Sequence, residues 1–103
     1  MTLRMIDQSS SGSRVQVAVG DELQLVLPET RTAGYKWQIV SADSPVFALR
    51  DDGSQIPAAI GGTGSHRWTI TAVKRGSAAL ELVYGRSWET EAAKRFEVAI
   101  VVS

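Results

Sequence analysis

The stretch RWTITAVKRGSAALELVY, from Arg67 to Tyr84, decides the fold class of this chain. In its first part the apolar residues Trp68, Ile70 and Ala72 alternate with polar ones. The same alternation returns after a Lys-Arg-Gly turn and continues to Tyr84. A period of two indicates strands that bury one face. The stretch therefore predicts two β-strands joined by a tight turn.

Similar alternating runs occupy much of the remaining chain. They lie at 15–19, 23–27, 35–39 and 96–102, with a weaker run at 46–49. The segment 56–60 contains Pro57 and is at best an edge strand, since proline cannot donate to a ladder. The segment 89–95 is the candidate helix, and it is too short to be stable alone. Short strands with turns about every ten residues predict an all-β fold, an immunoglobulin-like antiparallel β-sandwich of about seven or eight strands.

The length of 103 residues predicts one domain, 1–103, in which the segment 1–13, a short apolar piece at 1–6 followed by a polar, serine-rich run at 8–13, is loosely ordered. The chain has 11 basic and 11 acidic residues, so it lacks the long-range field that attracts nucleic acid or an anionic membrane. No apolar run approaches the roughly 20 residues of a membrane span. We therefore expect a monomer that binds neither nucleic acid nor membrane.

The N-terminal residues Met1 to Gly12 lack the apolar core of a signal peptide. The expected location is cytoplasmic if the numbered chain is complete, and periplasmic or secreted if a signal peptide was removed. The absence of cysteine removes the usual indication of a redox compartment.

Enzyme chemistry is not indicated by this sequence. The one histidine, His66, has Ser65 and Asp52 as candidate triad partners, but a lone histidine at a strand edge or on the surface is the favoured interpretation. The pair Asp51-Asp52 precedes Gly53 and is typical of a turn. One histidine and no cysteine argue against zinc. We predict no catalytic residue, no metal and no cofactor.

Three connections remain to be explained, at 30–34, 61–65 and 85–92. Alternate connections of an immunoglobulin-like sandwich lie at the same end, so these three form one row. The last contains Trp88 outside any strand pattern. Trp88 is either a lid on the core or a binding anchor, because tryptophan is common in both roles. The Gly-Gly-Thr-Gly run of the second lacks the lysine and the helix of a phosphate-binding loop.

The three connections resemble those of the chagasin-type inhibitors of papain-like cysteine proteases. That family carries an Asn-Pro-Thr-Thr-Gly-Tyr loop, a Gly-Gly-x-Gly loop and an Arg-Pro-Trp loop. This chain has Thr30-Arg31-Thr32-Ala33-Gly34-Tyr35, then Gly61-Gly62-Thr63-Gly64, then Arg86-Ser87-Trp88. Framework residues are also similar, namely Trp37, the run 72–76 and the run 82–84. The resemblance covers roughly Val15 to Val102.

The resemblance implies a reversible inhibitor whose partner is a papain-like cysteine protease. The implied protease-binding residues are Thr30, Arg31, Thr32, Ala33, Gly34, Gly61, Gly62, Thr63, Gly64, Arg86, Ser87 and Trp88. Thr32 would cover the catalytic cysteine and histidine of the protease, and Trp88 would lie against aromatic side chains beside the cleft. Arg86 would pair with acidic or carbonyl groups there. The glycines would let the second loop approach the other flank closely.

Two of the three loops depart from the family pattern, at four positions in total. Thr30, Arg31 and Ala33 stand for Asn, Pro and Thr in the first loop, and Ser87 stands for Pro in the third. These changes bear on inhibitory strength more than on the fold. Two other functions stay open: a non-inhibitory immunoglobulin-like adhesion or accessory module, and a β-sandwich that binds a carbohydrate or peptide on Trp88.

Overall fold

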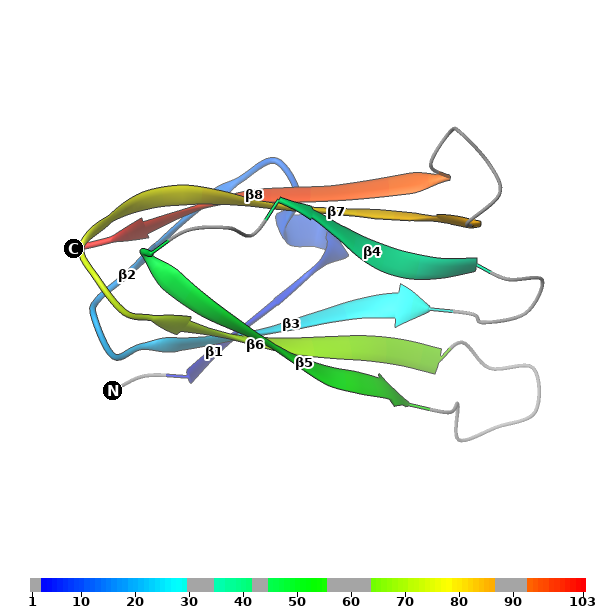
Figure 1. Cartoon of the computed structure of the whole chain (residues 1–103), viewed down its shortest axis with the longest axis horizontal. Helices are drawn as coiled ribbons and strands as arrows, with labels where there is room; N and C mark the ends of the chain where they lie inside the picture. Colours follow the sequence, from blue (N-terminus) through cyan, green and yellow to red (C-terminus); the bar gives the residue numbers. More distant parts are fainter. Residues whose placement is uncertain (1–2, 30–34, 42–44, 56–63, 87–92) are drawn as a thin grey trace.

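Two four-stranded sheets face each other in the computed structural model of this chain (Figure 1). The structure describes residues 3–29, 35–41, 45–55, 64–86 and 93–103. The first sheet has the order β1-β3-β6-β5 and the second β2-β8-β7-β4. The strands are β1 (Leu3–Asp7), β2 (Arg14–Val17), β3 (Glu22–Glu29), β4 (Tyr35–Ser41), β5 (Phe47–Gln55), β6 (Gly64–Ala72), β7 (Gly76–Arg86) and β8 (Lys94–Val102). The predicted β-sandwich is confirmed.

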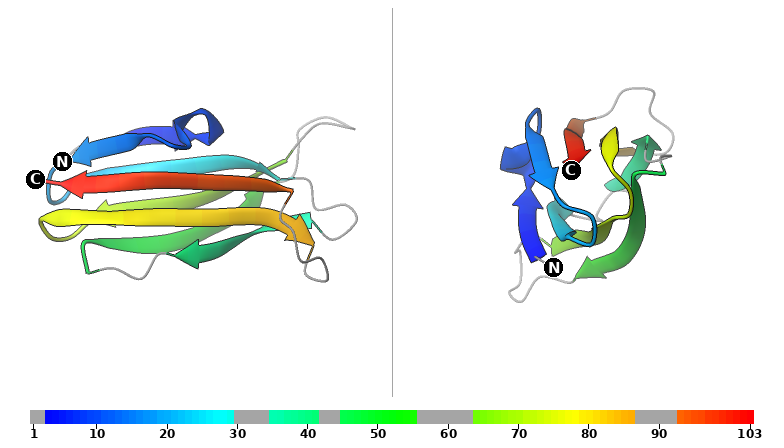
Figure 2. Two further views of the ribbon diagram at one scale, coloured as in Figure 1. Left: turned by 90° about the horizontal axis from the view of Figure 1, so that it is seen from above. Right: turned by 90° about the vertical axis from the view of Figure 1, so that its left-hand side faces the viewer.

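The pairing is antiparallel within each sheet except at one edge. β1 pairs with β3 in parallel, and β2 pairs with β8 in parallel. Figure 2 shows β1 and β2 together at this edge of the sandwich. The prediction of an antiparallel sandwich is therefore corrected at this edge, where two strand pairs are parallel. The alternating pattern could not predict this, because it indicates which face of a strand is buried and not the direction of its neighbour.

The N-terminal segment differs from the loose order expected for 1–13. Leu3–Asp7 forms β1, and Gln8–Ser10 forms the 3-10 helix η1. Asp7 caps this turn, because its carboxylate accepts a hydrogen bond from the Ser9 backbone N–H at 2.9 Å. Ile6 is buried in the core. Pairing with β3 and one buried side chain thus order a segment that its polar composition marks as a loop.

The core lies between the two sheets and consists of the inward-facing residues of every strand. In β3 the residues Leu23, Leu25 and Leu27 are buried, as the alternation predicts. The largest fully buried side chains are those of Trp68 and Phe96, one from each sheet. Burial of one such side chain is worth roughly 1.5–3 kcal/mol. The alternating runs of the sequence are therefore the main source of stability.

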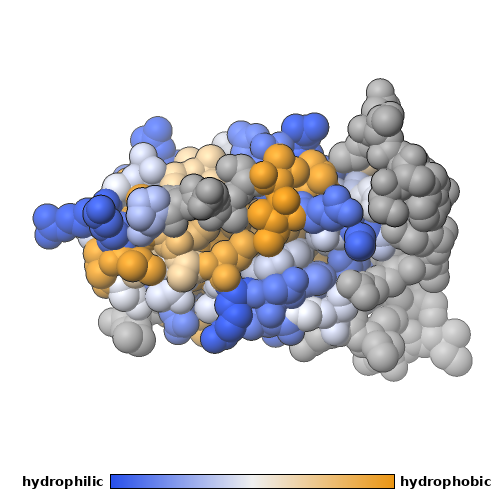
Figure 3. Space-filling view, in the orientation of Figure 1, coloured by the Kyte–Doolittle hydropathy of each residue, from blue (hydrophilic) through white to orange (hydrophobic). Residues whose placement is uncertain are grey.

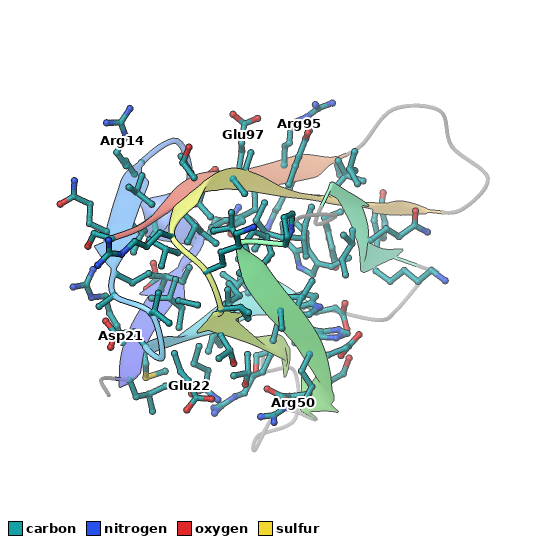
Figure 4. The ribbon with its side chains drawn as sticks, turned by 60° about the vertical axis from the view of Figure 1, so that its left-hand side comes forward. Arg14, Asp21, Glu22, Arg50, Arg95 and Glu97 are labelled. Atoms are coloured by element: carbon teal, nitrogen blue, oxygen red, sulfur yellow. The ribbon has the colours of Figure 1, made fainter. Side chains whose placement is uncertain are left out.

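The outer faces of both sheets carry polar and charged side chains. Figure 4 labels several of these, including Arg50 on the first sheet and Arg95 on the second. Arg95 Nη1 lies 2.8 Å from Glu81 Oε2. On the face seen in Figure 3, apolar surface lies in patches among hydrophilic residues. No helix of the described residues is long and apolar enough to cross a membrane.

β5 continues through the segment that the sequence analysis assigned to a turn, Asp51-Asp52-Gly53. Asp51 is the register partner of Trp68, and Gly53 is the partner of Arg67, so one extra residue is inserted between them. Gly53 has a φ of 89°. An extra residue beside a glycine with positive φ is a β-bulge. Turn-forming residues therefore mark a bulge here and not a strand end.

Candidate functional site

The three connections predicted to form one row leave from the same end of the sandwich. Three pairs of strand residues fix this arrangement: Glu29 with Gly64, Tyr35 with Arg86, and Tyr84 with Lys94. These pairs lie at the right-hand end of the molecule in Figure 1. We call this the loop end. The predicted row is thus supported by the strand ends that flank the three connections.

Most of the predicted protease-binding residues lie outside the described residues. These are Thr30, Arg31, Thr32, Ala33, Gly34, Gly61, Gly62, Thr63, Ser87 and Trp88. The two described ones were both expected in loops, but Gly64 begins β6 and Arg86 ends β7. Backbone pairing to Glu29 and Tyr35 extends these strands beyond their alternating runs. The role of Trp88 as lid or anchor stays a prediction.

A network of polar side chains at the loop end extends from the core, where Glu29 and His66 are buried, to the surface, where Asp51 and Ser54 are exposed. The Glu29 side chain is fully buried, and His66 is only 6% exposed. His66 Nδ1 lies 3.2 Å from both carboxylate oxygens of Glu29. Ser54 Oγ donates to Glu29 Oε1 at 2.5 Å, and His66 Nε2 lies 2.6 Å from Asp51 Oδ1. We call these four residues the acid–histidine network.

The expectation of a surface or edge position for His66 is wrong. Its register partner in β3 is Leu27, and its ring stacks on Trp68 with centroids 4.1 Å apart. His66 precedes the alternating run Trp68, Ile70, Ala72 by two residues and therefore shares its buried face. The period-two alternation thus predicts burial of position 66. The sequence analysis began the run at Trp68 and so did not include His66. The partners Glu29 and Ser54 are 37 and 12 residues away in sequence, so no local motif reveals them.

The β5 bulge explains how Asp51 and Ser54 both reach His66. In a regular strand, residues three apart point to opposite faces. The extra residue makes Asp51 the partner of Trp68 and Ser54 the partner of His66, which lie on the same face of β6. Gly53 N also donates to Asp51 Oδ1 at 2.8 Å, which fixes the carboxylate. The bulge therefore places both Asp51 and Ser54 within reach of the His66 ring.

Trp37 connects this network to the second sheet. Its backbone N donates to Glu29 Oε2 at 3.1 Å, and its Nε1 donates to the carbonyl oxygen of Pro28 at 2.8 Å. Its ring lies 5.0 Å from that of Tyr84, which stacks on Tyr35 at 5.5 Å. β3 and β4 belong to different sheets. Trp37 therefore joins the two sheets on both sides of the segment 30–34.

A second polar cluster lies on the outer face of β5 and β6 and is separate from the network. Asp52 accepts hydrogen bonds from Thr69 Oγ1 and, at 2.7 Å, from Arg50 Nε. The Thr69 hydroxyl, followed by the Arg50 guanidinium, lowers the pKa of Asp52 below its ordinary value. Arg50 projects outward from the sheet in Figure 4.

The arrangement at the loop end does not resemble a catalytic centre. A triad needs a hydroxyl whose proton the histidine removes. Here the Ser54 hydroxyl donates to Glu29, and the same Nδ1 that faces Ser54 also faces this carboxylate. Among the described residues there is no group of three or more histidine, cysteine or acidic side chains suited to hold a metal ion.

Comparison with known sequences assigns this architecture to a family. The sequence profile described as "chagasin family peptidase inhibitor I42" matches residues 16–100. The chain belongs to the chagasin family. This confirms the resemblance seen in the three loops, and members of an inhibitor family are not enzymes, as predicted. Comparison with curated protein sequences gives no significant match.

Solved structures of similar fold agree with this membership. The cysteine protease inhibitor EhICP2 from Entamoeba histolytica has a TM-score of 0.88 at 18% identity, covering 99% of this chain and 96% of that one. Amebosin has a TM-score of 0.73 at 22% identity, with 97% of each chain covered. PbICP-C, solved in complex with falcipain-2, has a TM-score of 0.69 at 14% identity, covering 97% of this chain and 98% of that one. The likeness extends over the whole sandwich.

Proposed function

We propose that this chagasin-family protein inhibits papain-like cysteine proteases reversibly, with the three loops of the loop end inserted in the substrate cleft. The observation that carries the proposal is geometric. The strand ends that flank all three family loops lie together, at Glu29 and Tyr35, at Gly64, and at Arg86 and Lys94. Family membership and the two relatives described as a cysteine protease inhibitor and as a falcipain-2 complex support the same target class.

The proposed mechanism is obstruction of the cleft by a preorganised surface. Thr32 would cover the catalytic cysteine and histidine without presenting a well-placed scissile bond. Trp88 and the 61–64 segment would contact the two flanks of the cleft. The β-ladders and the buried core hold the bases of the loops before binding. Little additional order is then required on association, which favours affinity.

Steady-state titration tests the proposal. Papain and several cathepsin L-like enzymes are assayed with increasing concentrations of the full chain. We expect reversible inhibition, with full recovery of enzyme activity and intact inhibitor after dissociation. Lack of inhibition at tens of micromolar across all of these enzymes would contradict the proposal.

Trp88→Ala then separates the two roles of this side chain. A binding anchor of this type typically contributes about 2 kcal/mol or more to affinity, which corresponds to a rise of about 30-fold in Ki. A core lid would instead lower the free energy of unfolding by about 3–5 kcal/mol. Inhibition and thermal melting are measured on the same preparation. We expect the large effect in Ki.

A further inference from the structure

We propose that the acid–histidine network of Glu29, Ser54, Asp51 and His66 is a positioning device for two of the inhibitory loops, and that its Glu29–His66 pair contributes to protease affinity without touching the protease. The proposal rests on the proposed function, because its effect is read as a change in inhibition. All four residues are described, and they come from three neighbouring strands, β3, β5 and β6.

The network lies at the strand ends that flank two of the loop-end segments. Glu29 is the last residue of β3 and directly precedes the segment 30–34. Ser54 and His66 lie two residues before and three residues after the segment 56–63. One set of hydrogen bonds therefore fixes three of the four chain ends from which these two segments start. The fourth chain end is the start of β4, and it is fixed because Trp37 N donates to Glu29 Oε2.

The buried Glu29 carboxylate is surrounded by hydrogen-bonding partners. Leaving a fully buried carboxylate without partners is costly. Here Ser54 Oγ and Trp37 N donate to it, and His66 Nδ1 lies 3.2 Å from both of its oxygens. On the other side of the ring, His66 Nε2 lies 2.6 Å from Asp51 Oδ1. An apolar cluster would fill the same space without this desolvation cost, so the hydrogen-bonded carboxylate points to a defined geometry at this place.

Glu29 also connects the two sheets. Glu29 bonds to His66 and Ser54 in the first sheet and to Trp37 N in the second. Charged hydrogen bonds of this kind are short, directional and stronger than neutral ones. The network thus ties the two sheets together at the base of the segment 30–34, and the same set of bonds holds the strands that flank the segment 56–63.

The test compares Glu29→Gln with two controls. Glu29→Gln keeps the shape of the side chain and leaves a carbonyl oxygen for Trp37 N, but removes the charge. Asp52→Asn makes the same carboxylate-to-amide change on the outer face of β5, away from the network. Val102 lies in the buried core at the end of β8 that is farthest from the loop end. Val102→Ala is therefore expected to lower the melting temperature without altering the loop end.

We expect Glu29→Gln to raise Ki about tenfold or more against the most strongly inhibited papain-like protease. Asp52→Asn and Val102→Ala should leave Ki within twofold, although Val102→Ala melts at a lower temperature. All variants are assayed well below their melting temperatures, so that loss of global stability does not contribute to Ki. A purely structural role of Glu29 would lower its melting temperature and leave Ki unchanged.

A double-mutant cycle with His66→Gln provides the second readout. If the pair acts as a unit, the Ki of the double variant should be clearly lower than the product of the two single effects predicts. The backbone amide resonance of Trp37 should also move in Glu29→Gln, because its acceptor changes from a carboxylate to a neutral amide oxygen, and should be unchanged in Asp52→Asn.

The outcomes are distinct. If the wild-type chain inhibits and Glu29→Gln, while folded, inhibits equally well, the positioning role is wrong and the proposed function stands. If the two single effects multiply independently, the pair does not act as a unit, and this part of the proposal is overturned. If the wild-type chain inhibits no papain-like protease, the proposed function itself is wrong and the contribution to affinity is withdrawn with it.

Discussion

The two ends of this sandwich close the same core with different chemistry. At the loop end the buried residues include a carboxylate, an imidazole and the aromatic rings of Trp37 and Tyr84. At the opposite end, which we call the distal end, the core is closed by Val17, Val46, Phe47, Ala72 and Val102. Apolar contacts are non-directional, whereas charged hydrogen bonds fix distances. The distal end therefore contributes stability, and the loop end contributes geometry at some cost in stability.

The connections between strands also differ between the distal end and the loop end. At the distal end β6 and β7 are joined by residues 73–75, and Val73 N and Lys74 N both donate to the Val46 carbonyl oxygen. Gly76 begins β7 with a φ of 143°, and a Cβ added there would meet Val46 Cγ2 at 3.0 Å. This described turn is short and is packed on the core. At the loop end, by contrast, the strand ends that flank the connections are joined by the hydrogen bonds of the acid–histidine network and Trp37.

The largest expected effect is on stability at the distal end. Phe47→Ala removes a side chain that is 4% exposed and should lower the free energy of unfolding by about 3–5 kcal/mol. Because Phe47 is far from the loops, Ki should stay within twofold wherever the variant is folded. Urea denaturation and protease inhibition on one sample test both parts. A Ki that rises in step with the loss of stability would remove the distinction between the two ends.

At the loop end the expected effect is smaller in stability and larger in inhibition. Trp37→Phe keeps most of the ring but leaves the Pro28 carbonyl oxygen without the Nε1 donor. We expect a loss of about 1–3 kcal/mol in stability. Since this bond lies at the base of the segment 30–34, Ki should rise severalfold. An unchanged Ki together with a lower melting temperature would show that Trp37 only stabilises the core.

The β5 bulge gives a third comparison. Gly53 has positive φ and no atom within 4 Å of an added Cβ, so a substitution there costs backbone strain alone. Gly53→Ala should lower stability by about 1–2 kcal/mol. Gly53→Asn should cost less, because asparagine tolerates this conformation. Equal costs for alanine and asparagine, measured by urea denaturation, would mean that the bulge relaxes and does not hold Asp51 and Ser54 in place.

The smallest expected effect is the pH dependence of the outer cluster. The pKa of Asp52 is lowered in the folded protein, mainly by Thr69 and then by Arg50. Its contribution to stability is therefore complete above about pH 4, the ordinary carboxyl range, and is lost as the pH falls through the lowered pKa. The difference in melting temperature between wild type and Asp52→Asn should be constant near neutral pH and shrink in acid. A difference that grows in acid would contradict this assignment.

The sequence predicted the strands well because buried apolar residues recur at every second position along them. The runs containing Leu23, Trp68 and Leu82 all appear as expected. It did not predict β1 or the parallel edge pairs, since pairing partners far apart in sequence leave no local pattern. It also missed the acid–histidine network, because Asp51 and Ser54 share a face only through a bulge that resembles a turn.

The family loops were predicted from their residues and their order. The positions of Gly64 and Arg86 show that the strands extend further than alternation indicated. Backbone hydrogen bonds to Glu29 and Tyr35 extend them, and glycine or arginine at a strand end carries no signal of such pairing.

The most direct test of the central claim is to map the protease contact on the full chain by amide chemical shifts. Papain with alanine in place of its catalytic cysteine is titrated into the isotope-labelled protein. We predict that amides at the loop end, such as those of Tyr35, Gly64 and Lys94, shift or broaden, while those of Val17, Ala72 and Gly76 at the distal end do not. Perturbation centred on the distal end, or none at a saturating concentration, would contradict the account.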